Sequence, residues 1–232
     1  MYFTAMRCIK SNGQVAGLAM FMLVGSGCYH PVTTMFETSE SLEAGETKVT
    51  LAGTVSPESI HGDYAGTSLT GIVDHGISAN QDIRLRVERR NAMSESPVSY
   101  SSGQYSLLLD SYSFLELGSK WSASSTANNL AASLPIQLYI PDEGKAFFIL
   151  DPRVILSTKI ADEKMEVSSV FHVQLGGVWG GEEVPGIMPG IALGVGFGKH
   201  HATRLEVGWS NETITFGFGR QFRTKKDQDP QL

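Results

Sequence analysis

The chain has 232 residues, of which 41% are hydrophobic and 18% charged, and 24 acidic against 18 basic residues give a formal net charge of −6. This acidic balance, without a basic patch, argues against nucleic acid as a partner. The length is enough for one sizeable domain. The mean hydropathy of −0.06 does not exclude a membrane barrel, because only every second residue of a barrel strand faces lipid.

The N-terminus has the layout of a secretory signal peptide. Arg7 and Lys10 give a basic start, residues 15–24 form a short apolar core, and small residues lead to Cys28. Such a core is too short to span a bilayer as a helix. We therefore expect a signal peptide over 1–27 and export of the remaining chain.

The end of this signal resembles the lipobox of bacterial lipoproteins, in which cleavage just before a cysteine leaves that residue to be acylated. Gly27 and Cys28 match the motif and Ser26 is compatible with it, whereas Gly25 stands where leucine is usual. The resemblance implies lipidation of Cys28 and a lipid-proximal tether over 28–45. The alternative is an ordinary signal cut near Gly27 that leaves Cys28 as a free thiol. The only other cysteine would leave with the signal, so the exported chain forms no internal disulfide.

Alternation of apolar and polar residues predicts strands along the rest of the chain, because successive side chains of a strand point to opposite faces. The clearest case is 81–90, where Ile83, Leu85 and Val87 alternate with charged residues. Strands are expected in chain order over 46–56, 64–77, 81–90, 112–122, 130–140, 146–158, 165–179, 191–198, 203–210 and 213–222.

Two prolines mark expected irregularities in these strands. Proline cannot donate a ladder hydrogen bond, so Pro135 should be a local fault in the fifth strand and Pro152 a bulge or irregular point in the sixth. The longest connection, 91–111, is rich in Ser and Tyr and has room for a further short strand at 105–109.

The strand count and lengths match a membrane barrel. About ten strands of roughly nine to eleven residues suit a tilted bilayer crossing, and an even count puts both ends of the barrel on one side. With a lipid anchor on the periplasmic leaflet, both termini are periplasmic and the longer connections 57–63, 91–111 and 180–187 lie outside. The expected fold is an all-β, antiparallel, up-and-down transmembrane β-barrel over 46–222, followed by a polar C-terminal tail over 223–232.

The chain resembles small bacterial outer-membrane β-barrel proteins, including lipoproteins with the same layout. The resemblance rests on Gly27-Cys28, on the stretches 41–46 and 76–86, and on the aromatic run from Phe216 to Phe222, which resembles the terminal strand signal that barrel assembly machinery recognises. The tail beyond Phe222 departs from the family, whose members commonly stop at the terminal aromatic. The resemblance implies the bacterial outer membrane as location, with outer-membrane lipid and, during biogenesis, the assembly machinery as partners.

The two faces of each strand would then meet different surroundings. If the apolar face touches lipid, the polar face lines the lumen, where charges of both signs pair and fill a narrow interior. The expected lumen charge network comprises Arg84, Arg86, Glu88, Glu116, Lys120, Asp151, Arg153, Arg204 and Glu206. The alternative role for such charges is an ion- or solute-selective pore or ligand cavity built from Arg84, Arg86, Arg153 and Glu116.

The three tryptophans lie near the ends of expected strands. Trp121 falls at a periplasmic end, and Trp179 and Trp209 fall at outer ends. Aromatic rings at such positions are typical of the lipid–water boundary. We therefore expect these residues to be interface aromatics.

Catalysis is not predicted. The sequence has no G-x-S-x-G or H-E-x-x-H motif and no Cys/His cluster at metal-ligand spacing, and the tandem His200-His201 is best interpreted as a solvated turn. No metal or cofactor is expected, and the sequence identifies no small-molecule ligand. The interpretation is an outer-membrane barrel (lipo)protein with a structural, binding or small-solute pore role. The competing class is a soluble periplasmic β-sandwich or lipocalin-like ligand-binding lipoprotein, whose apolar faces would point inward.

Overall fold

The structure is a computed structural model, and it describes residues 34–57, 66–92, 111–123, 129–142, 146–160, 164–177, 187–198, 202–210 and 213–224. In this part of the chain no helix is long and apolar enough to cross a membrane. Its strands are β1 (Thr47–Ser56), β2 (Gly66–Ser78), β3 (Gln81–Ala92), β4 (Ser111–Ala123), β5 (Asn129–Pro141), β6 (Phe147–Leu150), β7 (Arg153–Ile160), β8 (Met165–Gly177), β9 (Ile187–Phe197), β10 (Thr203–Ser210) and β11 (Thr213–Thr224).

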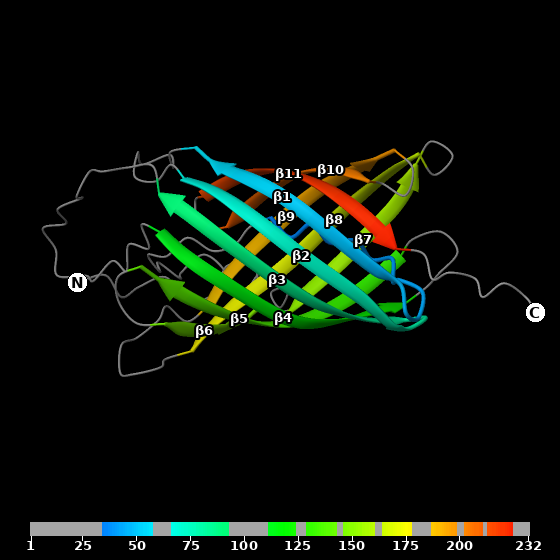
Figure 1. The fold of residues 1–232 in the computed structure, drawn as a ribbon, viewed down its shortest axis with the longest axis horizontal. Helices are drawn as coiled ribbons and strands as arrows, with labels where there is room; N and C mark the ends of the chain where they lie inside the picture. The colour runs from blue at the N-terminus through cyan, green and yellow to red at the C-terminus, as the bar shows by residue number, and fades with distance from the viewer. Residues whose placement is uncertain are drawn as a thin grey trace, which may run out of the picture.

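The strands close into one antiparallel barrel (Figure 1). Apart from β6 and β7, strands that follow one another in the sequence pair in the sheet, and β1 pairs with β11 to complete the ring. Strands β6 and β7 both pair with β5 and β8, so they share one position and the ring has ten strand positions. The predicted all-β antiparallel barrel of about ten strands is confirmed.

The sixth predicted strand is divided at Asp151 and Pro152, which lie between β6 and β7. The breaks in the ladder are bridged locally, because the Asp151 amide donates to the Pro135 carbonyl at 3.0 Å and the Val173 amide donates to the Pro152 carbonyl at 3.2 Å. Strand β5 continues through Pro135. Only one of the two proline positions therefore interrupts a strand.

Both ends of the barrel chain lie at the same rim. Thr47 at the start of β1 pairs with Thr224 at the end of β11, and we call this end of the barrel the terminal rim. The opposite end, where Ser210 pairs with Thr213 across the β10–β11 hairpin, is the far rim. Strand β11 runs two residues beyond the predicted boundary at Phe222.

The outer face of the barrel is apolar. Leu85, Leu193 and Phe218 point outward with 44%, 51% and 55% of their surface exposed. The same exposed row continues around the ring through Leu51, Leu69, Val73, Leu117, Leu134, Ile136, Val154, Phe171, Leu205, Val207 and Phe216. A soluble sandwich or lipocalin-like fold would bury these residues in its centre. The structure rejects that alternative.

Among the described residues, the lumen holds charged side chains together with buried apolar ones, which include a cluster of aromatic rings. Tyr139 stacks on Phe147 with ring centroids 5.0 Å apart and meets the edge of Phe114 at 4.9 Å. Tyr112 joins them at 5.3 Å from Tyr139. These four rings line the inner face of β4, β5 and β6 toward the far rim. Alternation along the strands predicts a polar lumen, and this aromatic cluster corrects that prediction.

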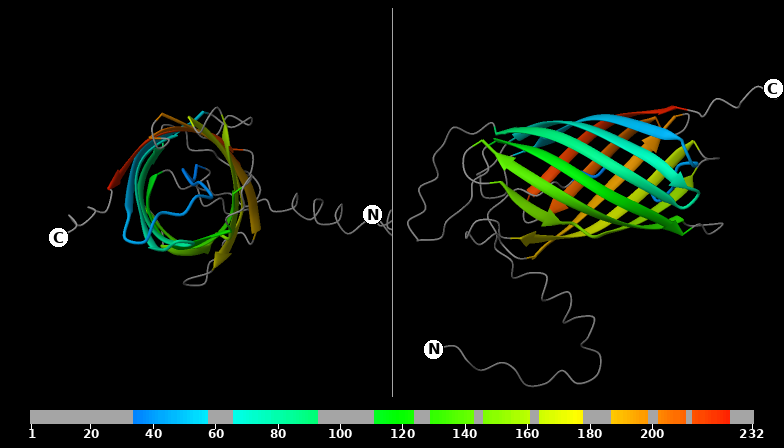
Figure 2. Two further views of the ribbon diagram at one scale, coloured as in Figure 1. Left: turned by 90° about the vertical axis from the view of Figure 1, so that its right-hand side faces the viewer. Right: turned by 60° about the horizontal axis from the view of Figure 1, so that its bottom comes forward.

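The N-terminal part of the described chain runs inside the barrel (Figure 2). We call residues 34–42 the plug, since residues 34–39 are buried in the lumen. The plug connects to β1 through a tight turn at the terminal rim, where Gly45 has a φ of 85° and its amide donates to the Gly76 carbonyl at 2.8 Å.

The plug lies within the segment predicted as a lipid-proximal tether. The stretch has no strand alternation, and this absence of a pattern predicts a linker. Its residues are held in the lumen instead, because the inward-facing charged side chains of the barrel wall hydrogen-bond and pair with it.

Candidate functional site in the barrel lumen

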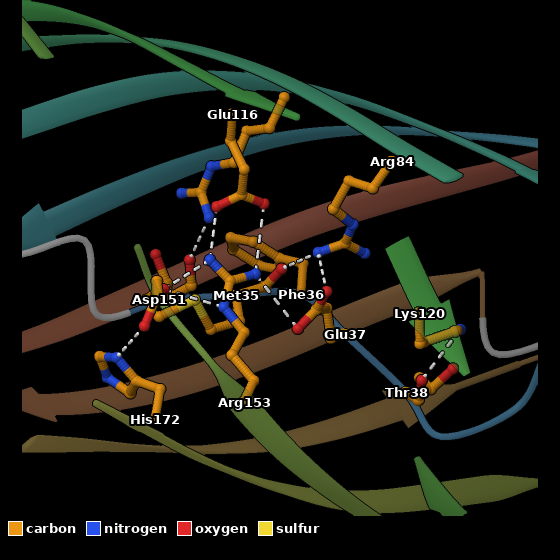
Figure 3. Close-up of polar contacts among 12 residues, drawn as sticks. Met35, Phe36, Glu37, Thr38, Arg84, Glu116, Lys120, Asp151, Arg153 and His172 are labelled. Carbon is orange, nitrogen blue, oxygen red and sulfur yellow. Dashed lines mark hydrogen bonds and ion pairs between the residues drawn. The ribbon is translucent and has the colours of Figure 1, made fainter. Parts of the chain in front are cut away.

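The centre of the plug is Glu37, whose carboxylate lies between two arginines of the wall (Figure 3). Oε1 is 2.9 Å from Nη1 of Arg84 on β3, and Oε2 is 3.2 Å from Nη1 of Arg153 on β7. All three side chains are buried. A carboxylate removed from water needs such charged partners, because an unpaired buried charge is strongly destabilising.

Arg153 joins the plug to a cluster of wall carboxylates. Its guanidinium pairs with Glu116 on β4, and its Nη2 lies 2.7 Å from Oδ2 of Asp151. Gln137 on β5 donates to the same two carboxylates at 2.9 Å and 2.8 Å. His172 Nδ1 lies 3.1 Å from Oδ1 of Asp151. Arg153 is therefore surrounded by three carboxylates, one of which belongs to the plug.

Arg84 forms the second half of this arrangement. Its Nε lies 2.7 Å from Oδ1 of Asp74 on β2, and Lys48 on β1 pairs with the other oxygen of Asp74 at 3.0 Å. Nη1 of Arg84 also donates to the Met35 carbonyl at 2.9 Å. Arg84 thus binds both the backbone of the plug, at Met35, and the side chain of Glu37.

Further wall side chains bind the backbone of the plug. The amides of Met35 and Phe36 both donate to the carboxylate of Glu206 on β10, the second at 2.9 Å. Arg204 donates to the Glu37 carbonyl at 2.8 Å, and Arg86 donates to the Thr34 carbonyl at 2.7 Å. Closer to the terminal rim, the same kind of contact is made by Lys120 to the Thr38 and Glu40 carbonyls, Ser122 to the Ser39 carbonyl, Ser157 to the Ser39 amide and Asp82 to the Leu42 amide.

The ring of Phe36 rests on two glycines of β11. A Cβ built on Gly217 would lie 2.6 Å from Cζ of Phe36, and one on Gly219 would lie 3.1 Å from its Cδ1. Phe36 also has a φ of 49°, a conformation that residues with a Cβ rarely adopt and that costs about 1–2 kcal/mol. The surrounding contacts hold this strained residue in place.

Other inward glycines provide space for charged side chains of the network. A Cβ on Gly194 of β9 would lie 2.8 Å from Cζ of Arg204, and one on Gly190 would lie 2.6 Å from Cε1 of His172. The glycines on the inner face of β9 and β11 therefore leave space for bulky side chains in the lumen.

An ionic contact ties the plug to the terminal rim. Glu40 lies 3.1 Å from Nη2 of Arg223 and 3.5 Å from Nζ of Lys159. Burial acts to raise the pKa of Glu40, but the attraction of Arg223 and Lys159 outweighs it, and the pKa lies below its ordinary value.

All residues of the predicted lumen charge network point into the barrel and are at most 5% exposed. Ion pairs are described above for Arg84, Glu116, Asp151 and Arg153, and the role of the whole set as a lumen charge network stays a prediction. Trp121 is outward and half-exposed near the terminal rim, and Trp209 is likewise near the far rim. Cys28, Trp179, His200 and His201 lie outside the described residues, as does most of each of the three long connections.

The plug residues are not recognisable from sequence periodicity. Phe36 and Glu37 stand in a polar stretch without periodicity, and the only available signal was the apolar pair Met35-Phe36 in that stretch. Within the described ranges, no group of three or more His, Cys, Asp or Glu side chains is placed to hold a metal ion. The arrangement can bind a peptide backbone together with a carboxylate side chain, and the plug supplies both.

No family model matches the sequence, and the comparison with curated proteins found no match. Among solved structures, the chain is similar to an outer membrane channel from Pseudomonas putida F1, with 10% identity, a TM-score of 0.47, and coverage of 83% of this chain and 100% of that one. A bacterial polysaccharide outer membrane secretin matches at 10% identity and a TM-score of 0.41 over 77% and 98% of the two chains. A loop-deletion mutant of the outer membrane protein OmpT of Vibrio cholerae matches at 11% identity and a TM-score of 0.31, over 77% and 62%. At these values the similarity assigns neither a family nor a function to the chain.

Proposed function

We propose that the chain is an integral β-barrel of the bacterial outer membrane whose lumen is closed by its own residues 34–42. The observation that carries this proposal is the inverted distribution of side chains. Apolar residues such as Leu69 and Leu117 are 73% and 63% exposed on the outside, while charged residues are buried within. A continuous apolar surface of this extent is unfavourable in water and is matched by the hydrocarbon of a bilayer.

The seated plug favours a closed barrel over an open pore. Its backbone and its Glu37 carboxylate occupy the centre of the lumen, at the level of Arg84, Arg153 and Glu206. A structural or binding role therefore fits this state better than free passage of solutes. The lumen charges bind the plug rather than a moving ion.

The membrane assignment is tested on the full-length protein expressed in a bacterium with an outer membrane. We expect the protein to resist extraction by alkaline carbonate and to migrate differently on gels before and after heating in detergent. Release by carbonate alone would contradict an integral barrel. In planar bilayers, the wild type is expected to show little conductance, and a steady large conductance would contradict the closed state.

The lipid anchor at Cys28 is part of the proposal and rests on the lipobox-like sequence that ends at this residue. Cells fed a radioactive or alkyne-tagged fatty acid should incorporate the label into the wild type. The Cys28→Ser variant should carry none. Equal labelling of both proteins, or of neither, would remove the lipoprotein assignment and leave the barrel assignment unaffected.

A further inference from the structure

The contacts between barrel and plug are dominated by the main chain of the plug. Side chains of the wall bind carbonyls from Thr34 to Glu40 and amides of Met35, Phe36, Ser39 and Leu42. The plug itself belongs to no strand of the sheet. Recognition of a peptide backbone by side chains does not require the peptide to be covalently continuous with the site.

Two plug side chains add selectivity to these backbone contacts. Phe36 lies over Gly217 and Gly219, where a Cβ would come within 2.6 Å and 3.1 Å of the ring. Glu37 is bound by Arg84 and Arg153, and charge-assisted hydrogen bonds of this kind are stronger than neutral ones. The sites that hold Phe36 and Glu37 therefore favour a peptide in which an aromatic residue is followed by an acidic one.

We propose that the lumen is a binding site for an acidic peptide, and that residues 34–42 occupy it as an intramolecular ligand. The inference rests on the proposed barrel and gives the chemical class of its ligand. Attachment to β1 through Gly45 gives the plug an effective concentration on the order of millimolar. A free peptide of the same sequence therefore competes only when the attached plug is weakened.

The test uses full-length protein purified in detergent and a dye-labelled synthetic peptide with the sequence of residues 34–42. Binding is followed by fluorescence anisotropy. The weakened protein is the double variant Phe36→Ala/Glu37→Gln, which leaves the wall unchanged. We expect it to bind the peptide at least about tenfold more tightly than wild-type protein does. A peptide carrying the same two substitutions should bind about tenfold more weakly than the natural peptide, the size expected for losing a charge-assisted hydrogen bond.

A second variant tests the shape of the aromatic slot. In Gly217→Ala the added methyl meets the ring of Phe36, so a peptide with Phe36→Ala should bind this variant more tightly than the natural peptide does. The matched control is Gly71→Ala on β2, where a Cβ has nothing within 4 Å, and it should behave as wild type.

The outcomes separate the two proposals. Failure of the wild type to show heat-dependent gel migration would overturn the barrel itself. If the variants migrate as folded barrels but bind no peptide, or bind the natural and substituted peptides equally, the peptide site is wrong and the barrel stands. If the double variant does not fold, the Gly217→Ala comparison decides alone, and an unchanged order of peptides would overturn the inference.

Discussion

At the scale of single residues, the lumen depends on how completely its buried charges are paired. Arg153 pairs with three carboxylates, those of Glu37, Glu116 and Asp151. The alternation of apolar and polar residues predicts that Arg153, Glu116 and Asp151 point inward. It does not predict the position of Glu37, because the segment around that residue shows no alternation.

Replacing Arg153 with Met should strongly destabilise the barrel. The change leaves three buried carboxylates without their shared cation, and breaking a buried pair typically costs about 3–5 kcal/mol. Denaturant unfolding of the protein in lipid or detergent measures this loss. The control is Arg89→Met, which removes an exposed ion pair to Asp142 and should change stability far less. Equal effects of the two variants would contradict the assigned network.

Glu40 should make seating of the plug depend on pH. Its pKa is lowered in the folded state, so its stabilising contribution is present above the ordinary value of 4.5 and is lost as the pH falls through the folded value. The difference in unfolding free energy between the wild type and Glu40→Gln should therefore shrink below about pH 4.5. A difference that stays constant across this range would show that the ionised carboxylate does not hold the plug at the rim.

At the scale of elements, strands were predictable because one rule governs all of them. Each strand has one face on the outside of the barrel and one in the lumen. Apolar and polar residues therefore alternate along β3 and β11. The division of the sixth position into β6 and β7 was only partly foreseen. The missing N–H of Pro152 explains an interrupted ladder there. It does not explain why Pro135 leaves its strand intact, because that depends on the residues of β4 that lie opposite Pro135.

Gly118 on β4 is the neighbour that allows β5 to pass through Pro135. The two residues are paired across the sheet, and a Cβ on Gly118 would lie 2.9 Å from Cβ of Pro135. Gly118→Val should overpack this contact and cost about 1–3 kcal/mol, measured by denaturant unfolding. The matched change Gly71→Val, at a position with free space, should cost much less. The reverse order would refute this account of β5.

At the scale of the whole molecule, the closed ring and its apolar outer face were predictable from the number of strands and the alternation of residues. The occupation of the lumen by the plug was not predictable in this way. How much space the wall side chains leave inside depends on the geometry of the closed barrel, and which segment enters that space depends on contacts between residues far apart in the sequence, such as Phe36 with Glu206.

Replacing an outward leucine with arginine distinguishes a bilayer from water around the barrel. Leu85 lies in the middle of β3, opposite Leu117 of β4. In a membrane, Leu85→Arg should cost about 2–4 kcal/mol near the bilayer midplane. On a protein surrounded by water, the same exposed substitution should change stability by no more than about 0.5 kcal/mol. Unfolding in lipid vesicles measures the difference.

Which residues touch hydrocarbon can be observed directly by photolabelling. Membranes containing the full-length protein are loaded with a lipid-soluble carbene precursor and irradiated, and the modified residues are located by mass spectrometry. We predict labels on outward residues such as Leu69, Leu117 and Phe218, and none on inward Gln137 or Tyr139. Labelling of the inward residues, with Leu117 and Phe218 unmodified, would contradict the account.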